Sequence, residues 1–368
     1  MPHHRLRRAL VILAVLPFLL GNAPTTAEAA LPSDAAGASD LATAAHDFPP
    51  GDEGYHTYPE MVSEIHAVAA AHPNIVRLFT IGKSYLGRDL WAAEVSDNVG
   101  VNEGETEILF DGLHHAAEHM AAEMPLAILH WLTDGYASNA NVKQLVDHRR
   151  IWIVFMVNPD GGQYDISGGY YHDWRKNRQP TPGSTAIGTD INRNYGYKWG
   201  CCGGSSSNPF SSRYRGPKAW STPEARAIRD FVKSRVVAGR QRITVGISFH
   251  TAGRLVLYPF GYTTDPTPPD MPLLDHQVFV ALADSMASRN GYTPEQGSTL
   301  YITDGSEGSW LYGRQHIFAF VFELTNTDNP PDEQIGLETE LNRTAIFYLI
   351  THAPCPYAVV GRADMCTH

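Results

Sequence analysis

Residues 108–119 read Ile108-Leu109-Phe110-Asp111-Gly112-Leu113-His114-His115-Ala116-Ala117-Glu118-His119. The apolar start of this stretch is typical of a buried β-strand. The chain then passes through a glycine into a His-x-x-Glu pair, His115 and Glu118, which i, i+3 spacing places on one helical turn. A helical pattern follows from near Glu123. The pair predicts two metal ligands, whereas polar residues at the start of a helix are the alternative interpretation.

Short apolar runs alternate with amphipathic helical patterns beyond this stretch. The pattern predicts strands over 76–81, 90–95, 151–157, 245–249, 256–258 and 318–324, and helices after a cap at Thr57 and over 222–235, 277–289 and 337–351. Strands that interleave with helices favour an α/β fold with a buried sheet. We therefore predict a single domain with a central twisted mixed sheet and helices on both faces.

The N-terminus has the pattern of a secretion signal. Arg5, Arg7 and Arg8 precede an apolar run over 9–20, and Ala27-Glu28-Ala29 supplies a cleavage site. This predicts a signal peptide at 1–29, a leader or pro-segment at 30–52 and a catalytic domain at 53–368. No later apolar run reaches the length of a membrane span, so we expect a secreted protein without a membrane partner.

Charge and cysteine content narrow the class further. The formal net charge of −11 argues against a nucleic-acid partner. Four cysteines in an exported chain predict two disulfides. Three connectivities are possible, and we favour Cys201–Cys202 with Cys355–Cys366; free buried thiols are the alternative.

A third metal ligand is predicted at the end of a strand. His250 follows the run 245–249, and by itself it could equally be a core or turn histidine. Together with His115 and Glu118 it completes two imidazoles and one carboxylate. Three protein ligands with one open position are the pattern of a catalytic zinc site.

Glu323 is the candidate base. It lies in the apolar run 318–324, on the face that Ala319 and Val321 share and opposite three phenylalanines. A buried carboxylate is costly unless it is paired or near a metal, so the position favours a functional group. A strand edge that faces water is the alternative.

Two of the arginines in the long irregular section 163–220 belong to short polar motifs. Arg175 belongs to Trp-Arg-Lys, and Arg193 belongs to Asn-Arg-Asn after Asp190. A guanidinium group binds carboxylates and oxyanions through two parallel hydrogen bonds. These residues are candidate anion ligands, although basic residues in loops are usually solvated.

Taken together, these motifs resemble the zinc metallocarboxypeptidases of the carboxypeptidase A/B type, and most closely their bacterial carboxypeptidase T branch. The resemblance runs from about residue 55 to 353. It rests on seven motifs in order: His115-Ala-Ala-Glu118, Asn158-Pro-Asp-Gly161, Trp174-Arg175-Lys176, Asn192-Arg193-Asn194, Ser248-Phe-His250, Tyr301-Ile-Thr-Asp304-Gly305 and Phe322-Glu323-Leu324.

The resemblance implies a role for each matching residue. His115, Glu118 and His250 would bind one catalytic zinc ion. Glu323 would assist attack by a zinc-bound water, and Arg175 would stabilise the oxyanion. The substrate residues that it implies are Asn192 and Arg193 for the free C-terminal carboxylate and Tyr301 as a mobile cover. The implied partners are peptides and proteins with a free C-terminus, and we expect a monomer.

The departures from the family pattern concern the substrate. Ala117 stands where an arginine is common, which predicts weaker binding of the penultimate region. Gly308 stands where the preference for the released side chain is often set, and it suggests a roomy pocket without its own charge. Asp304 and Glu307 are the nearby carboxylates that could favour basic residues, so we expect broad specificity.

Two other interpretations stay open. A zinc hydrolase of the same fold could act on cell-wall peptides with γ-D-glutamyl or D-amino acid links, or on N-acyl amino acids. The chain could also be an inert zinc-binding module, although that would require one of the ligands, Glu323 or Arg175 to be missing. All five are present.

Overall fold

The computed structural model describes residues 47–366. The predicted signal peptide and most of the predicted leader lie outside the described residues. An eight-stranded sheet has the order β1-β2-β4-β3-β7-β10-β8-β9. Strands β4, β3, β7 and β10 pair in parallel, β1 and β2 form an antiparallel edge, and β8 returns antiparallel to β10. The predicted mixed sheet is confirmed.

The elements follow one another along the chain as strands and covering helices. The strands are β1 (Val76–Lys83), β2 (Asp89–Val95), β3 (Thr106–Gly112), β4 (Arg149–Val154), β5 (Val236–Val237), β6 (Arg240–Gln241), β7 (Ile243–Thr251), β8 (Leu255–Tyr258), β9 (Thr293–Gln296) and β10 (Phe318–Leu324). The α-helices are α1 (Tyr58–Ala71), α2 (Met120–Tyr136), α3 (Ala140–Asp147), α4 (Pro159–Asp165), α5 (Pro223–Ser234), α6 (Leu273–Asn290), α7 (Gly297–Leu300), α8 (Glu307–Gln315) and α9 (Ile335–His352).

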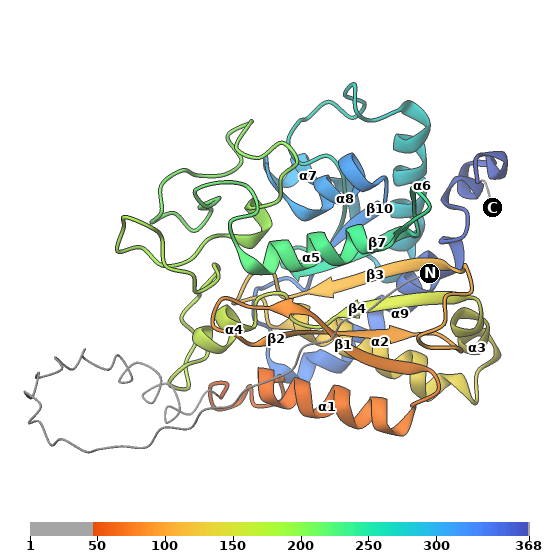
Figure 1. Ribbon diagram of the computed structural model, residues 1–368, viewed down its shortest axis with the longest axis horizontal. Helices are drawn as coiled ribbons and strands as arrows, with labels where there is room; N and C mark the ends of the chain where they lie inside the picture. Colours follow the sequence, from red (N-terminus) through yellow and green to blue (C-terminus); the bar gives the residue numbers. More distant parts are fainter. Residues whose placement is uncertain (1–46, 367–368) are drawn as a thin grey trace, which may run out of the picture. The chain divides into compact units, whose positions relative to one another are not determined.

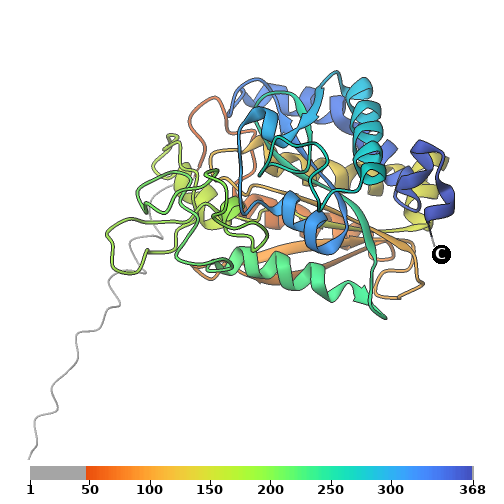
Figure 2. The same cartoon turned by 90° about the horizontal axis from the view of Figure 1, so that it is seen from above.

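Helices cover both faces of the sheet. In Figure 1 the sheet strands run through the middle of the domain, with α5 above them. Figure 2 shows α5 on one side and α2, α6 and α9 on the other. The apolar residues of all these layers form one continuous buried cluster, which confirms the predicted single α/β domain.

Helix α1 shows how local sequence sets an element. Thr57 accepts a hydrogen bond from the Glu60 amide, and the Glu60 side chain accepts one from the Thr57 amide. This capping box satisfies two backbone donors that a helix start leaves free. Met61, Ile65 and Val68 are buried, so the helix packs its predicted apolar face.

The start of α2 differs from the sequence expectation. The helix begins at Met120, not near Glu123, and His115 and Glu118 lie in the turn before it. The Glu118 amide donates to the His115 carbonyl over 3.3 Å, so a tight turn brings the pair together instead of a helix. Gly112 permits this path, because a Cβ there would lie 1.9 Å from the Ala121 carbonyl oxygen.

The N-terminal end of the described chain packs against the domain. Phe48 is buried and packs against the rings of Tyr55 and His119, while the domain start at residue 53 stays a prediction.

Both favoured disulfides, Cys201–Cys202 and Cys355–Cys366, are confirmed. Within residues 47–366, no helix has the length and apolarity needed to span a bilayer.

Candidate active site

The candidate residues meet where the parallel strands end. His115 follows β3, His250 is the penultimate residue of β7, and Glu323 is the penultimate residue of β10. Glu323 stands directly opposite His250 in the register of β10 and β7. Carboxyl ends of parallel strands meet at one edge of a sheet, and ligand sites of α/β proteins form there.

Three donor groups converge on one point. His115 Nδ1 lies 2.7 Å from Glu118 Oε1, His250 Nδ1 lies 2.7 Å from Glu118 Oε2, and the two Nδ1 atoms are 3.1 Å apart. All three side chains are buried. Glu118 and His250 are separated by 131 residues of sequence, and the fold makes them neighbours in space.

This arrangement fits a metal cation. If each Nδ1 atom donated a proton to Glu118, two N–H groups would face each other across 3.1 Å, and a cation removes that conflict. Burial lowers the pKa of His250 and so favours the neutral imidazole that binds metals. Two imidazoles and one carboxylate are a donor set that zinc accepts.

Asp190 supports the metal ligands and was not predicted as a site residue. Its Oδ1 atom lies 3.3 Å from His115 Nε2, and its Oδ2 atom accepts from Arg175 Nε over 2.9 Å. Burial opposes ionisation, but Arg175 and His115 hold the pKa of Asp190 well below its usual range. A carboxylate behind a ligating histidine orients the ring. Its position just before Asn192 and Arg193 was the signal in the sequence.

Glu323 faces a pocket that also reaches the metal ligands. Ala319, Val321 and Glu323 all line this pocket, which confirms that they share one face of the strand. Burial and the nearby Glu118 raise the pKa of Glu323 to about 8, while Arg175 and Arg193 act in the opposite direction. A carboxylate with a raised pKa can hold or release a proton near neutral pH.

Two guanidinium groups present free nitrogen atoms at the site. The Nη2 atoms of Arg175 and Arg193 are buried and have no hydrogen-bond partner within the described chain. Arg193 lines the pocket beside Asn192, whose amide nitrogen lies 3.2 Å from His250 Nε2. The ring of Tyr301 lies 5.8 Å from the Arg193 guanidinium carbon, so these predicted residues are brought together.

The predicted specificity residues divide into two groups. Gly308 lines the pocket, and a Cβ added there would meet nothing closer than Val321 Cγ2 at 3.8 Å. Asp304 is not among the lining residues; it accepts hydrogen bonds from the amides of Cys202 and Gly204. Its carboxylate therefore points to a loop and not to the substrate pocket.

Glu307 also turns away from the pocket. Its carboxylate lies 3.5 Å from His114 Nε2 in the core, and burial together with Asp111 raises its pKa well above the usual range. The Glu307 carboxylate is buried and outside the pocket lining, so it does not face a substrate side chain. The geometry thus gives neither Asp304 nor Glu307 the contact with substrate that the sequence suggested.

Comparison with known proteins agrees with the metal site that this geometry indicates. The family model of zinc carboxypeptidases matches residues 61–345. A zinc carboxypeptidase of Saccharothrix mutabilis subsp. capreolus is 45% identical over 321 residues, which cover 86% of this chain and 73% of that protein. Carboxypeptidase A1 of Rattus norvegicus is 32% identical over 276 residues, covering 74% of this chain and 63% of that protein.

Solved structures show the same relationship. The crystal structure of thrombin activatable fibrinolysis inhibitor superposes with a TM-score of 0.74 at 26% identity, covering 81% of this chain and 74% of that one. The cluster of His115, Glu118 and His250 is the zinc site expected of such relatives. The chain belongs to the zinc carboxypeptidase family.

Proposed function

We propose that the protein is a zinc carboxypeptidase that hydrolyses the C-terminal peptide bond of peptides and proteins. One observation carries the proposal. A single pocket contains the buried metal ligands His115 and His250, the half-buried carboxylate of Glu323, and the free guanidinium nitrogen of Arg193. A metal, a base and an anion receptor are the components that such a reaction requires.

Arg193 would make the enzyme act only at chain ends. A buried N–H group without an acceptor costs free energy, and a substrate carboxylate would supply that acceptor with a charge-assisted bond. Asn192 stands beside it and would contribute its amide. Because an internal peptide bond has no carboxylate to offer, this receptor favours an exopeptidase.

The reacting groups would be divided between the metal and the protein. Bound zinc acts as a Lewis acid that lowers the pKa of water and polarises a carbonyl group. Glu323 would accept a proton from the attacking water at its carboxylate and pass it to the leaving amine. Arg175 would donate a hydrogen bond from Nη2 to the oxyanion. Tyr301, which is 39% exposed, would cover the bound residue.

The pocket supports a neutral, apolar C-terminal residue. Its walls include Leu257, Ala319 and Val321, and Gly308 adds no side chain. The carboxylates of Asp304 and Glu307 are engaged elsewhere. A lysine or arginine side chain would therefore lose its hydration without gaining a partner. We propose that apolar and aromatic residues are released in preference to basic ones.

The function is tested by digestion of a mixed set of linear peptides, followed by mass spectrometry. Free C-terminal amino acids should appear, a chelator should abolish their release, and added zinc should restore it. Amidation of the C-terminus should block cleavage. Purified muropeptides and N-acyl amino acids test the alternative substrates in parallel, and hydrolysis of these alone would overturn the proposal.

We also propose that the protein is exported and acts as a monomer. The signal peptide that the sequence predicts at 1–29 is the support for export. N-terminal sequencing of protein from culture medium should identify cleavage after Ala29. Light scattering coupled to gel filtration should give the mass of one chain, and retention of the uncleaved chain inside cells would contradict export.

A further inference from the structure

The buried guanidinium of Arg193 has an unusual environment. Within the described chain no carboxylate pairs with it; Nη1 donates to the Asn192 carbonyl over 2.8 Å and Nε donates to the Gly204 carbonyl over 3.2 Å. The remaining nitrogen, Nη2, is free. Two backbone carbonyls therefore decide where the free N–H group points, and one of them belongs to a loop eleven residues away.

Gly204 is held in place by Asp304. The Gly204 amide donates to Asp304 Oδ2 over 3.0 Å, and the Cys202 amide donates to the same oxygen over 3.1 Å. The Ser205 hydroxyl donates to Oδ1. A Cβ on Gly204 would lie 2.5 Å from the Cα of Thr303, so this loop packs directly on the chain between Tyr301 and Asp304.

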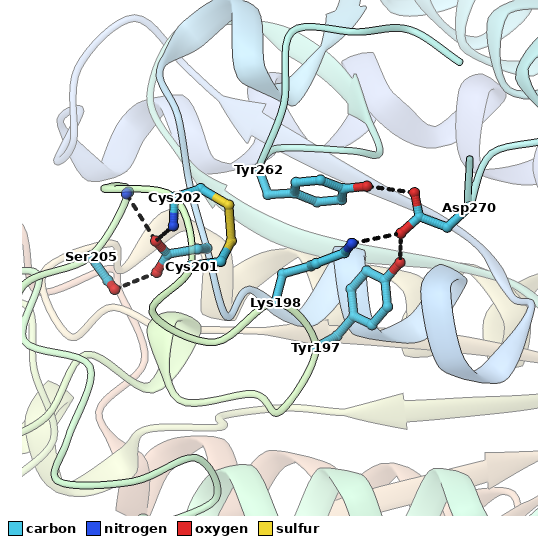
Figure 3. The surroundings of a disulfide bond; sticks show 9 residues. Tyr197, Lys198, Cys201, Cys202, Ser205, Tyr262 and Asp270 are labelled. Atoms are coloured by element: carbon cyan, nitrogen blue, oxygen red, sulfur yellow. Dashed lines mark hydrogen bonds and ion pairs between the residues drawn. A yellow bond between two sulfur atoms is a disulfide. The ribbon is translucent and has the colours of Figure 1, made fainter. Parts of the chain in front are cut away.

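The disulfide between the adjacent residues Cys201 and Cys202 lies in the same loop and restricts its backbone there. Figure 3 shows the bonded pair beside Ser205, with the hydrogen bonds of this segment drawn as dashed lines. Asp304 is 1% exposed, yet it has no cationic partner within the described chain. Its carboxylate instead accepts hydrogen bonds from donors of the loop 201–205. A buried carboxylate with three donors orients the groups that it binds.

We infer that Asp304 is a positioning residue for Arg193, acting through the loop 201–205, which contains the Cys201–Cys202 disulfide. The chain of contacts runs from Asp304 to the Gly204 amide, and from the Gly204 carbonyl to Arg193 Nε. Its effect is to aim Arg193 Nη2 at the C-terminal carboxylate of the substrate. The inference rests on the proposed function, in which Arg193 binds that carboxylate.

A second carboxylate nearby supplies a matched control. Asp270 accepts hydrogen bonds from the hydroxyls of Tyr197 and Tyr262 and pairs with Lys198 Nζ over 3.1 Å (Figure 3). Like Asp304 it joins three donors from neighbouring segments. None of these donors contacts Arg193 in any hydrogen bond of the described chain, so loss of Asp270 removes loop contacts without removing the path to the guanidinium.

The experiment measures carboxylate-dependent binding and turnover in zinc-loaded protein. In an inactive Glu323→Gln background, calorimetry gives Kd for one peptide with a free C-terminus and for its amide. In the active background, kcat and KM are measured on the free peptide. Asp304→Ala should raise Kd and KM for the free peptide about tenfold or more, with kcat little changed and with amide binding unaltered.

Conservative replacement separates positioning from simple loss of stability. Asp304→Asn keeps an oxygen for the Cys202 and Gly204 amides and an N–H group for Ser205, so KM should return to within about threefold of wild type. Asp270→Ala should lower the melting temperature while KM stays unchanged. A Cys201→Ser, Cys202→Ser double variant should raise KM in the same direction as Asp304→Ala.

The outcomes distinguish this inference from the proposed function. If Arg193→Ala fails to raise KM, the carboxylate receptor itself is wrong. If Arg193→Ala raises KM but Asp304→Ala does not, or if Asp270→Ala raises KM equally, Asp304 has no positioning role. An unchanged KM in the double cysteine variant would remove the disulfide from the path.

Discussion

At the scale of single residues, the site depends on charges that the fold leaves incompletely paired. Glu323 is half-buried and has no hydrogen-bonded cation within the described chain, and the Nη2 atoms of Arg175 and Arg193 have no acceptor there. Such groups cost folding free energy. Glu323 and Arg193 line one pocket, and Arg175 lies beside the metal ligand Glu118. Incompletely paired groups gathered in this way separate a reaction site from an ordinary cluster of buried polar groups.

Glu323→Gln tests the proposed base. The amide keeps the size of the side chain but cannot accept a proton from water, so kcat/KM should fall by roughly 10²- to 10⁴-fold. Because Glu323 is not a metal ligand in this arrangement, zinc content measured by mass spectrometry should stay at the wild-type value. Near wild-type turnover by a zinc-loaded variant would exclude Glu323 as the base.

The pH dependence follows from the same carboxylate. Burial and Glu118 raise the pKa of Glu323 to about 8, and the positive charge of bound zinc would lower it. A base must be ionised to act, so activity should increase as pH rises through this pKa. The acidic limb of kcat/KM in the zinc-loaded enzyme should therefore lie below pH 8. A rate that declines with rising pH across this limb would contradict a carboxylate base.

At the scale of elements, the pocket is built from the ends of three parallel strands, from β8, from α7 and from the first turn of α8. β3, β7 and β10 end at the same edge of the sheet and deliver His115, His250 and Glu323 there. The first turn of α8 brings Gly308 against the same face of β10, opposite Val321. The side-chain pocket is thus a gap between a strand and a helix, and its chemistry depends on very few positions.

Gly308→Asp should change which residue is released. The added carboxylate has room above Val321 and would offer a basic side chain the partner that the pocket lacks. We expect the ratio of kcat/KM for C-terminal lysine or arginine over leucine to rise by about tenfold or more. Gly308→Asn is the control of similar size, and an equal shift in that variant would show that volume, not charge, sets the preference.

At the scale of the whole domain, a long irregular segment adds residues to the site that the strand ends form. The section after α4 brings Asn192 and Arg193 to the pocket, and it brings Asp190 and Arg175 next to the metal ligands His115 and Glu118. Hydrogen bonds that Asp304 accepts from the Cys202 and Gly204 amides hold part of this section, next to the Cys201–Cys202 disulfide. The second disulfide lies elsewhere, beyond α9, and neither Cys355 nor Cys366 lines the pocket.

Removal of the Cys355–Cys366 bond should therefore affect stability and not activity. The bond joins residues eleven positions apart. By restricting the unfolded chain, a closed loop of this size raises the free energy of unfolding by about 2–3 kcal/mol. Unfolding of the Cys355→Ala, Cys366→Ala variant in urea should show that loss. A fall in kcat/KM measured well below the melting temperature would show that the C-terminal loop communicates with the site.

The extent of prediction differs between local and distant features. The cap at Thr57, the strand 318–324 and the alternation that places Glu323 with Ala319 and Val321 were predicted correctly. These features depend on neighbours along the chain, through side-chain caps and the two-residue period of strands. The placement of His115 and Glu118 on a helix was wrong, because the packing of Gly112 against Ala121 requires a turn there.

The sequence by itself determined the family, the mixed sheet and the three metal ligands, because their motifs combine local patterns with residue types that few chemistries share. Only the tertiary structure decided where the remaining charges point. Asp304 and Glu307 look equally able to meet a substrate in the sequence, but one binds the loop 201–205 and the other turns into the core. Side-chain direction at such positions is set by contacts between segments more than ninety residues apart, which no local pattern encodes.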